Sequence, residues 1–222
     1  MSQTGSDYRG RPYADEKWPG GPQKIPGRVL CACYDTGGEG VAYHDSDPEN
    51  HGSGELNPVN GSYLHSFRIN EGVDTSYVKY HDEIDNSPFN RVQPEKDLLY
   101  VGWTVPGEWL KYTVQVEADG LYSVTILYTS RRGGKITLDA ENGETLVCTI
   151  ESTYDAADPV EWRQWHHWNR QHVGEISLSA GIHVLTLKTA EEGNMNYACL
   201  EFKLKEGSLR QAAPCLAASR TG

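Results

Sequence analysis

Short segments of alternating apolar and polar residues fill the second half of the chain, and they constrain the fold more than any other feature. In EWLKYTVQV (108–116), every second residue from Leu110 to Val116 is apolar or aromatic. An alternation with a period of two places the two sets of side chains on opposite faces of a β-strand. Comparable segments, rich in β-branched and aromatic residues, occur at 28–34, 121–129, 134–140, 144–150, 175–181, 182–189 and 196–204.

Turn residues separate these segments. Asp119-Gly120 is a hairpin signal between the segments 108–116 and 121–129, and Gly, Asp and Asn punctuate the later segments. No stretch is long and periodic enough for a substantial amphipathic helix. We therefore predict an all-β protein with the architecture of a two-sheet β-sandwich, or jelly roll.

The composition along the chain predicts one domain with flanking segments. Residues 1–24 hold Pro, Gly and charged residues without periodicity and are interpreted as an N-terminal arm or linker. The sandwich is expected over 25–204, followed by a C-terminal tail at 205–222. Within the domain, residues 46–97 cluster Asn, Asp, Gly and Pro, which predicts elaborated loops on one edge of the sandwich.

The charge excludes some classes of partner. The formal net charge of −11 opposes binding to nucleic acid or to anionic membranes, whereas a neutral partner is not repelled. No stretch approaches the roughly 20 apolar residues of a membrane span. The first ten residues lack the apolar part of a signal peptide, so we interpret them as a cytoplasmic start or as the remainder of a chain whose export signal was removed.

The cysteines are too few and too irregular for a disulfide scaffold. Cys31 and Cys33 are expected on one face of the first strand, as buried thiols that pack like small apolar groups. A bridge from one of them to Cys199 is an alternative if the first and last strands are neighbours. An intermolecular bridge through Cys215 is a further alternative. The five cysteines are Cys31, Cys33, Cys148, Cys199 and Cys215.

Three of the six tryptophans fall within EWRQWHHWNR (161–170). If this stretch is a strand, Trp162 and Trp168 share one face and Trp165 points to the other. A single buried face cannot hold all three rings, so at least one ring should look away from the core.

Six blocks in the order of the sequence resemble the family 6 carbohydrate-binding modules. They are KIPGRVLCACYDTGGEGVAYHDSD, GVDTSY, YVGWTVPGEWLKYTVQVEADGLYSVTILYTS, WRQWHHW, LSAGIHVLTLKT and GNMNYACLEF, and they span roughly residues 25–204. The resemblance implies a jelly roll, in agreement with the strand pattern. It also implies a noncatalytic, extracellular or cell-surface module that binds plant or algal polysaccharide and targets an attached or partner glycoside hydrolase to it.

The resemblance further implies where the sugar binds. In the family, two aromatic rings and an Asn among the loops at one end of the sandwich hold a sugar ring. The Gly-aromatic pair five residues before the Gly-Glu-Trp turn corresponds to Gly102-Trp103, and the first Trp of the W-x-x-W block corresponds to Trp162. The Asn corresponds to Asn196 in preference to Asn194. The flat apolar face of a pyranose suits such rings.

Other residues near the expected cleft have two interpretations each. Trp165 either lines the cleft or packs in the core, while Trp168 is expected to pack. Tyr43 and Asp45 in VAYHDSD are expected to add contacts at the sugar edge, with turn stabilisation as the alternative for Asp45. Arg131-Arg132 is interpreted as a solvated turn, with contact to an acidic sugar as the alternative.

The family's structural calcium is a separate question. Its first strand has the pattern Ile-Glu-Ala-Glu, whereas the aligned stretch here is Val29-Leu30-Cys31-Ala32 and lacks both carboxylates. Calcium needs oxygen ligands. A retained site would depend on backbone carbonyls and on other carboxylates such as Glu201, and we expect no cofactor to be required.

Two other functions remain open. A small β-sandwich glycoside hydrolase or lyase would use two carboxylates about 5 to 10 Å apart, and acidic loop residues such as Glu39, Asp82 and Glu83 are present. A surface adhesion or assembly module would bind no sugar.

Overall fold

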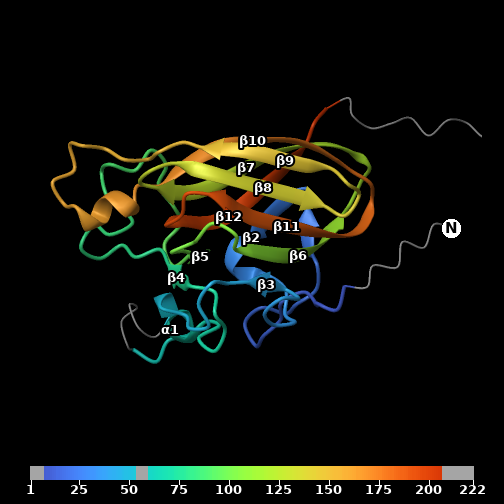
Figure 1. Cartoon of the computed structure of the whole chain (residues 1–222), viewed down its shortest axis with the longest axis horizontal. Coiled ribbons are helices and arrows are strands. Elements are labelled where there is room, and N and C mark those ends of the chain that lie inside the picture. Colours follow the sequence, from blue (N-terminus) through green and yellow to red (C-terminus); the bar gives the residue numbers. More distant parts are fainter. Residues whose placement is uncertain (1–7, 54–59, 207–222) are drawn as a thin grey trace, which may run out of the picture.

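Two antiparallel sheets lie face to face in the computed structural model, which describes residues 8–53 and 60–206 (Figure 1). The first sheet has the order β1 (Gln23–Ile25), β6 (Trp109–Val116), β11 (Gly181–Glu191), β8 (Gly134–Ala140), β9 (Thr145–Ile150), and β3 (Tyr43–His44) also pairs with β6. The second has the order β10 (Asn169–Leu178), β7 (Gly120–Ser130), β12 (Met195–Leu204), β5 (Leu99–Val101), β4 (Thr75–Tyr77), and β2 (Gly27–Leu30) also pairs with β12. The predicted two-sheet β-sandwich is confirmed; within the sheets, only the pairing of β1 with β6 is parallel among the described strands.

Tyrosines fill much of the space between the sheets. Tyr112, Tyr122 and Tyr128 are fully buried, in the phase that the alternation predicts. A buried phenol needs a hydrogen-bond partner. Tyr112 Oη donates to the carbonyl of Cys31 at 3.1 Å, and Tyr122 Oη donates to that of Ala118 at 2.6 Å. Each of these two phenols therefore keeps a hydrogen-bond partner although its ring is buried in the core.

A β-bulge changes the face that β12 presents along its length. The register between β12 and β7 shifts between Tyr197 and Cys199. Tyr197 packs between the sheets, Cys199 packs on the outer face, and Leu200 returns to the inner core. An extra residue in one strand resets the alternation in this way.

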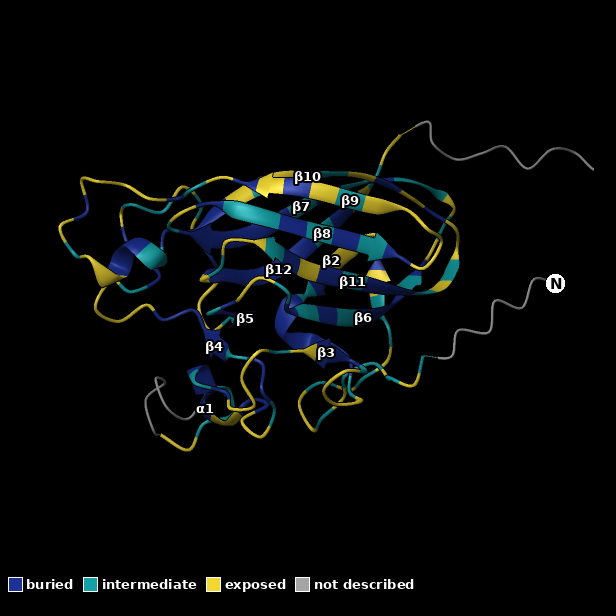
Figure 2. Cartoon of the chain, viewed as in Figure 1, coloured by how far each residue is buried: buried dark blue, intermediate teal, exposed yellow. Residues whose placement is uncertain are grey.

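The segment 78–98 covers the outer face of the second sheet, where a smaller apolar cluster forms around Trp168. Trp168 is fully buried and meets Tyr100 edge to face, with ring centroids 5.3 Å apart. Its Nε1 donates to Asp85 at 2.8 Å. The segment 78–98 thus covers a sheet face and not only an edge. In Figure 2 the loops near the short α1 (Tyr63–Ser66) lie below the sheets, and exposed residues gather mainly in the loops.

The first predicted strand is shorter than expected. β2 ends at Leu30, and Cys31–Cys33 form a 3₁₀ turn, so the prediction that both thiols share a strand face was wrong. β2 and β12 are neighbours, yet Cys31, Cys33 and Cys199 are buried free thiols. The packing interpretation is confirmed and the bridge to Cys199 is absent. Cys215 lies outside the described residues.

The described part of the N-terminal arm lies against the sandwich. Tyr8 Oη donates to Asp35 at 2.9 Å, and Tyr13 and Trp18 pack against the main core. β1 begins at Gln23, two residues before the predicted start of the domain. In the part of the chain that the structure describes, no helix has the length and apolar character needed to span a membrane.

We expect Trp168→Ala to lower the free energy of unfolding by about 3 to 5 kcal/mol, because it empties a large buried volume and removes one of the donors to the buried Asp85. Denaturant titration would measure this. Val147, which is 63% exposed on β9, provides the control: Val147→Ala should change the value by less than about 0.5 kcal/mol. Similar values for the two variants would contradict the placement of Trp168.

Candidate functional site

A pocket of about 300 Å³ lies at one end of the sandwich, among the loops that precede β6, β10 and β12. In Figure 1 this end carries the single-turn helix η3 (Trp162–Trp165). The pocket brings together most of the residues predicted from the sequence, and it adds His166. Its lining consists of Trp103, Trp162, Trp165, His166, Asn194 and Asn196, with no carboxylate among them.

Trp103 reaches the pocket through an unusual backbone conformation. β5 ends at Val101, and Trp103 has φ +50°, in the left-handed region that bulky residues rarely adopt. Such strain persists only where the surroundings hold it, and it clusters at binding and catalytic sites. Gly102 is required beside it, since a Cβ there would lie 2.6 Å from Oδ1 of Asn196. The ring and the amide are thus neighbours because of a glycine.

A second close approach places Asn194. A Cβ on Gly193 would lie 2.3 Å from the carbonyl oxygen of Thr104, and the Asn194 N–H donates to that same oxygen at 2.6 Å. Asn194 also has a left-handed φ of +54°, a conformation that Asn tolerates better than most residues. Its exposed amide therefore stands on the turn next to Trp103.

Asn196 has a fixed amide with one open acceptor. Its Nδ2 donates to Thr129 Oγ1 at 2.8 Å and to the carbonyl of Trp165 at 3.3 Å. Thr129 Oγ1 donates to the same carbonyl at 2.6 Å, which ties the end of η3 to β7. Within residues 8–53 and 60–206 no donor pairs with Asn196 Oδ1. That oxygen can accept a hydrogen bond from a ligand hydroxyl.

The buried carboxylate of Asp158 holds η3 in place. Arg163 donates to it through Nε and Nη2, each at 2.8 Å, and His167 Nε2 lies 2.8 Å from Oδ2. The Val160 N–H donates to Oδ1 at 2.9 Å and closes an Asx turn just before η3. The hydrogen bonds from Arg163, followed by that from His167, hold the pKa of Asp158 below its ordinary value against the effect of burial. An ionised hub thus fixes the turn between Trp162 and Trp165.

His166 is a pocket residue that the sequence analysis did not predict. Its Nδ1 lies 2.9 Å from Oδ1 of Asp85, and its ring meets that of Trp162 nearly edge to face at 6.1 Å. Asp85 is fully buried and also accepts from the Lys79 N–H at 2.8 Å. The partner lies 81 residues earlier in the chain, so no local signal could have found it.

The three clustered tryptophans have three different environments. Trp162 is 51% exposed, Trp165 is half-buried at the pocket wall, and Trp168 is fully buried. The expectations that one ring looks away from the core and that Trp168 packs are confirmed. The strand assumed for this stretch was wrong, because Trp162–Trp165 form a 3₁₀ turn and β10 begins only at Asn169.

Tyr43 and Asp45 do not lie in this pocket, so the sequence analysis misplaced them. Tyr43 is 6% exposed, and its hydroxyl accepts from the Gly72 N–H at 3.4 Å, which makes it a core residue. Asp45 Oδ1 accepts from the Asp47 N–H at 3.0 Å, the turn-stabilising alternative. Burial, and then the nearby charge of Glu108, raises the pKa of Asp45 to about 7.

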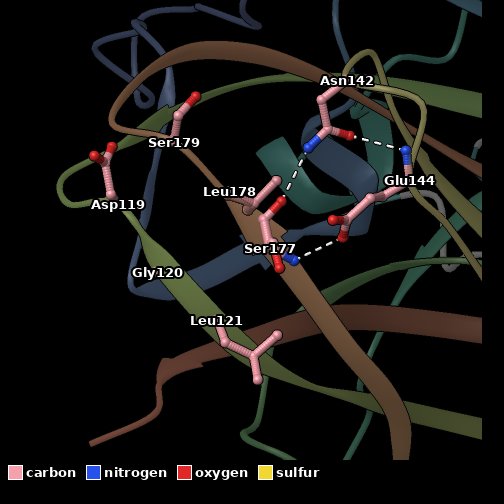
Figure 3. A pocket seen from close by; sticks show the side chains of 8 residues that line it. All are labelled: Asp119, Gly120, Leu121, Asn142, Glu144, Ser177, Leu178 and Ser179. Carbon is pink, nitrogen blue, oxygen red and sulfur yellow. Dashed lines mark hydrogen bonds between the residues drawn. The ribbon is translucent and has the colours of Figure 1, made fainter. Parts of the chain in front are cut away.

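A second pocket at the opposite end of the sandwich lacks the features of the first (Figure 3). It has about 430 Å³ and no aromatic ring in its lining. Its polar side chains already serve the backbone: Glu144 Oε2 accepts from the Ser177 N–H at 2.7 Å, and Asn142 Nδ2 donates to the Ser177 carbonyl at 2.9 Å. These side chains are already hydrogen-bonded to the backbone, so few polar groups remain to bind a sugar.

The residues present do not fit the family's calcium. Leu30 and Ala32 stand where carboxylates would be needed. Glu201, the proposed alternative ligand, pairs with Arg170 at 3.0 Å, so a cation already occupies that carboxylate. Across the described ranges, no three His, Cys, Asp or Glu side chains are grouped to hold a metal ion.

The fold and the end-loop pocket place the protein in the class of β-sandwich binding modules. Residues 89–205, more than half of the chain, match the model of the carbohydrate-binding module (family 6). The chain therefore belongs to this family, whose members bind carbohydrate without catalysing its cleavage. No curated protein matches the sequence significantly.

Solved structures of similar fold include sugar-binding modules and enzymes. A family 43 arabinoxylan arabinofuranohydrolase from Bacillus subtilis, in complex with cellotetraose, is 14% identical over 83% of this chain and 28% of that chain, with a TM-score of 0.50. A β-1,3-glucan-binding family 6 module from Bacillus halodurans is 15% identical over 82% and 99%, with a TM-score of 0.48. A module of a Cellvibrio mixtus lichenase, in complex with cellotriose, is 23% identical over 48% and 78%, with a TM-score of 0.39. These similarities bear on the fold alone.

Asp158 should make stability depend on pH. Because its pKa is lower in the folded chain, its contribution is present above the ordinary aspartate pKa of about 4 and is lost as the pH falls toward the folded value. We expect the free energy of unfolding of the unmodified protein to drop between pH 5 and pH 2, and Asp158→Asn to be less stable at pH 7 with a shallower drop.

Urea titrations across this pH range would measure both slopes. Asp155→Asn, which removes an exposed carboxylate three residues earlier, is the control and should keep the steeper slope. Equal slopes for Asp158→Asn and the unmodified protein would contradict the role of Asp158 as an ionised hub.

Proposed function

We propose that the chain is a noncatalytic module that binds plant or algal polysaccharide in the aromatic pocket and targets an attached or partner glycoside hydrolase to it. The observation that carries the proposal is the convergence of Trp103, Trp162 and Trp165 with the amides of Asn194 and Asn196 in one pocket. Family membership supports carbohydrate as the ligand.

The chemistry of the lining suits a sugar ring. A pyranose has an apolar face of C–H bonds and an equatorial belt of hydroxyl groups. Indole faces can stack on the apolar C–H face, at about 0.5–1.5 kcal/mol per ring by analogy with aromatic pairs. The open acceptor of Asn196 and the exposed amide of Asn194 can form hydrogen bonds with the hydroxyl groups, at about 1 kcal/mol per hydrogen bond.

After association costs these contacts leave about 4 to 6 kcal/mol, which corresponds to dissociation constants from roughly millimolar to tens of micromolar. Binding of this strength suits a module tethered to an enzyme, because the tether supplies a high effective concentration at the substrate. The enzyme partner and the extracellular or cell-surface location are inferred from the family.

Two alternatives belong to other classes. A hydrolase or lyase would need paired carboxylates at the sugar, and the lining of the aromatic pocket contains none. An adhesion or assembly module would leave the exposed Trp162 to contact a protein.

We expect Trp103→Ala and Trp162→Ala each to abolish measurable sugar binding while leaving the fold largely intact, because each removes a stacking surface from the pocket. Affinity electrophoresis against xylan, β-glucans, agarose and mannans, with a reducing-sugar assay beside it, is the measurement. Retardation of the unmodified protein without product release supports the proposal.

Tyr80→Ala is the matched control, because it removes another partly exposed ring that lies outside the pocket lining. Release of reducing sugar would favour the enzyme. Neither retardation nor product across the whole panel would favour the adhesion module. If Trp162→Ala unfolds the protein, as judged by circular dichroism, the assignment of that ring to the site is wrong.

We also propose that neither folding nor sugar binding needs calcium, since Arg170 already neutralises Glu201. Dialysis against EDTA should leave the melting temperature and the affinity unchanged, and added calcium should not raise either. A fall in melting temperature with EDTA that calcium reverses would contradict this proposal.

A further inference from the structure

Two adjacent arginines stand beside the aromatic pocket, on the turn between β7 and β8. The guanidinium carbon of Arg131 lies 5.2 Å from the ring centroid of Trp165, and that of Arg132 lies 5.9 Å from it. Trp165 lines the pocket, so both cations neighbour a ring that can contact a bound sugar. β8 begins at the end of the sandwich that carries η3 (Figure 1).

Hydrogen bonds hold the backbone of this turn. Ser130 Oγ pairs with both the N–H and the carbonyl of Gly133 at 3.0 Å, and Ser152 Oγ donates to the Arg131 carbonyl at 2.7 Å. Thr153 N–H donates to the Ser130 carbonyl at 2.7 Å. The backbone from which the two side chains extend is therefore held in place beside the pocket.

Within the described residues, no buried carboxylate neutralises the charge of these two arginines. Arg163, also near the pocket, is neutralised by Asp158 and Glu83. Arg131, in contrast, pairs with Glu161 at 3.7 Å, a side chain that is 84% exposed, and such pairs contribute little. Its guanidinium carbon also lies 5.8 Å from the ring centroid of Tyr154. Arg132 is exposed and pairs with no carboxylate within residues 8–53 and 60–206.

This local charge runs against the composition of the chain. The formal net charge is −11, yet the pocket lining has no carboxylate and its neighbours include two available guanidinium groups. A neutral sugar carries no anionic group that these guanidinium groups could pair with. A guanidinium presents a planar fork of donors that matches the two oxygens of a carboxylate or of a sulfate ester.

We propose that this pocket takes a glycan with an anionic substituent, in which one sugar stacks on the indole rings while the anionic oxygens contact Arg132 and Arg131. The proposal rests on the proposed function and names the substrate class of the same site. The shared chemistry is an anionic oxygen pair, whether it comes from the carboxylate of a uronic acid or from a sulfate ester.

Two matched pairs of polysaccharides test the proposal by isothermal titration calorimetry on the full chain. One pair is glucuronoxylan before and after chemical reduction of its carboxyl groups, and the other is carrageenan before and after desulfation. The anionic member of at least one pair should bind about three- to tenfold more tightly than its neutral form. The preference should shrink as NaCl rises from 50 to 500 mM, because salt screens exposed charges.

Arg132→Gln and the double variant with Arg131→Gln should lower the affinity for the anionic form more than the affinity for the neutral form, so that the preference disappears. Arg132→Lys should keep part of it, because a lysine retains the charge without the fork. Lys203→Gln removes one exposed positive charge from the far end of β12, and it should change nothing. Equal melting temperatures would establish that Arg132→Gln is folded.

The outcomes separate this inference from the proposed function. Equal affinity of the unmodified protein for both members of both pairs would overturn the anionic preference and leave sugar binding intact. A preference that survives in the double variant would overturn the role of the arginines. Binding to none of the four polymers would overturn this inference, whereas the proposed function would still be decided by the panel of xylan, β-glucans, agarose and mannans.

Discussion

Two buried carboxylates hold the tryptophan-bearing segment, and the shape of the pocket depends on them. Asp158 gathers Arg163 and His167, while Asp85 receives His166 and the indole N–H of Trp168. Between them they fix both ends of a stretch that has no sheet pairing of its own. A buried charge is costly unless it is hydrogen-bonded on several sides. Their full sets of partners make the segment a single, well-defined conformation rather than a mobile loop.

The sandwich could be predicted from the sequence because the patterns that define its strands and turns lie within short stretches of the chain. In the long strands β6 to β12, each strand alternates its own side chains, and turn residues mark most ends. The strands that were not predicted are β1, β3, β4 and β5, of two or three residues each, too short to show a period. The strand prediction for Cys31–Cys33 was wrong for the opposite reason. The alternation is present in the sequence, but the chain leaves the sheet at Leu30.

The pocket could be predicted only in part, and only through the resemblance. The motif around Trp103 and the W-x-x-W block led to the right loops, and the structure brings both rings to one pocket. Periodicity gave the wrong local structure there, because the 3₁₀ turn is set by Asp158 and by Glu83, which lies 80 residues from Arg163. Tyr43 was misplaced because an aromatic residue in a loop motif looks the same in sequence whether its ring is buried or open.

The backbone around Trp103 also determines how ready the pocket is for a ligand. Gly102 and Gly193 permit two close approaches that no other residue allows without displacement, and both bring an Asn beside Trp103. The strained φ of Trp103 is then held by the chain around it and not by a ligand. Since the Trp103 backbone and the Asn196 amide are already held in place, ordering them on binding costs little conformational entropy. A shallow, exposed pocket can then bind usefully with few contacts, provided that its walls do not move.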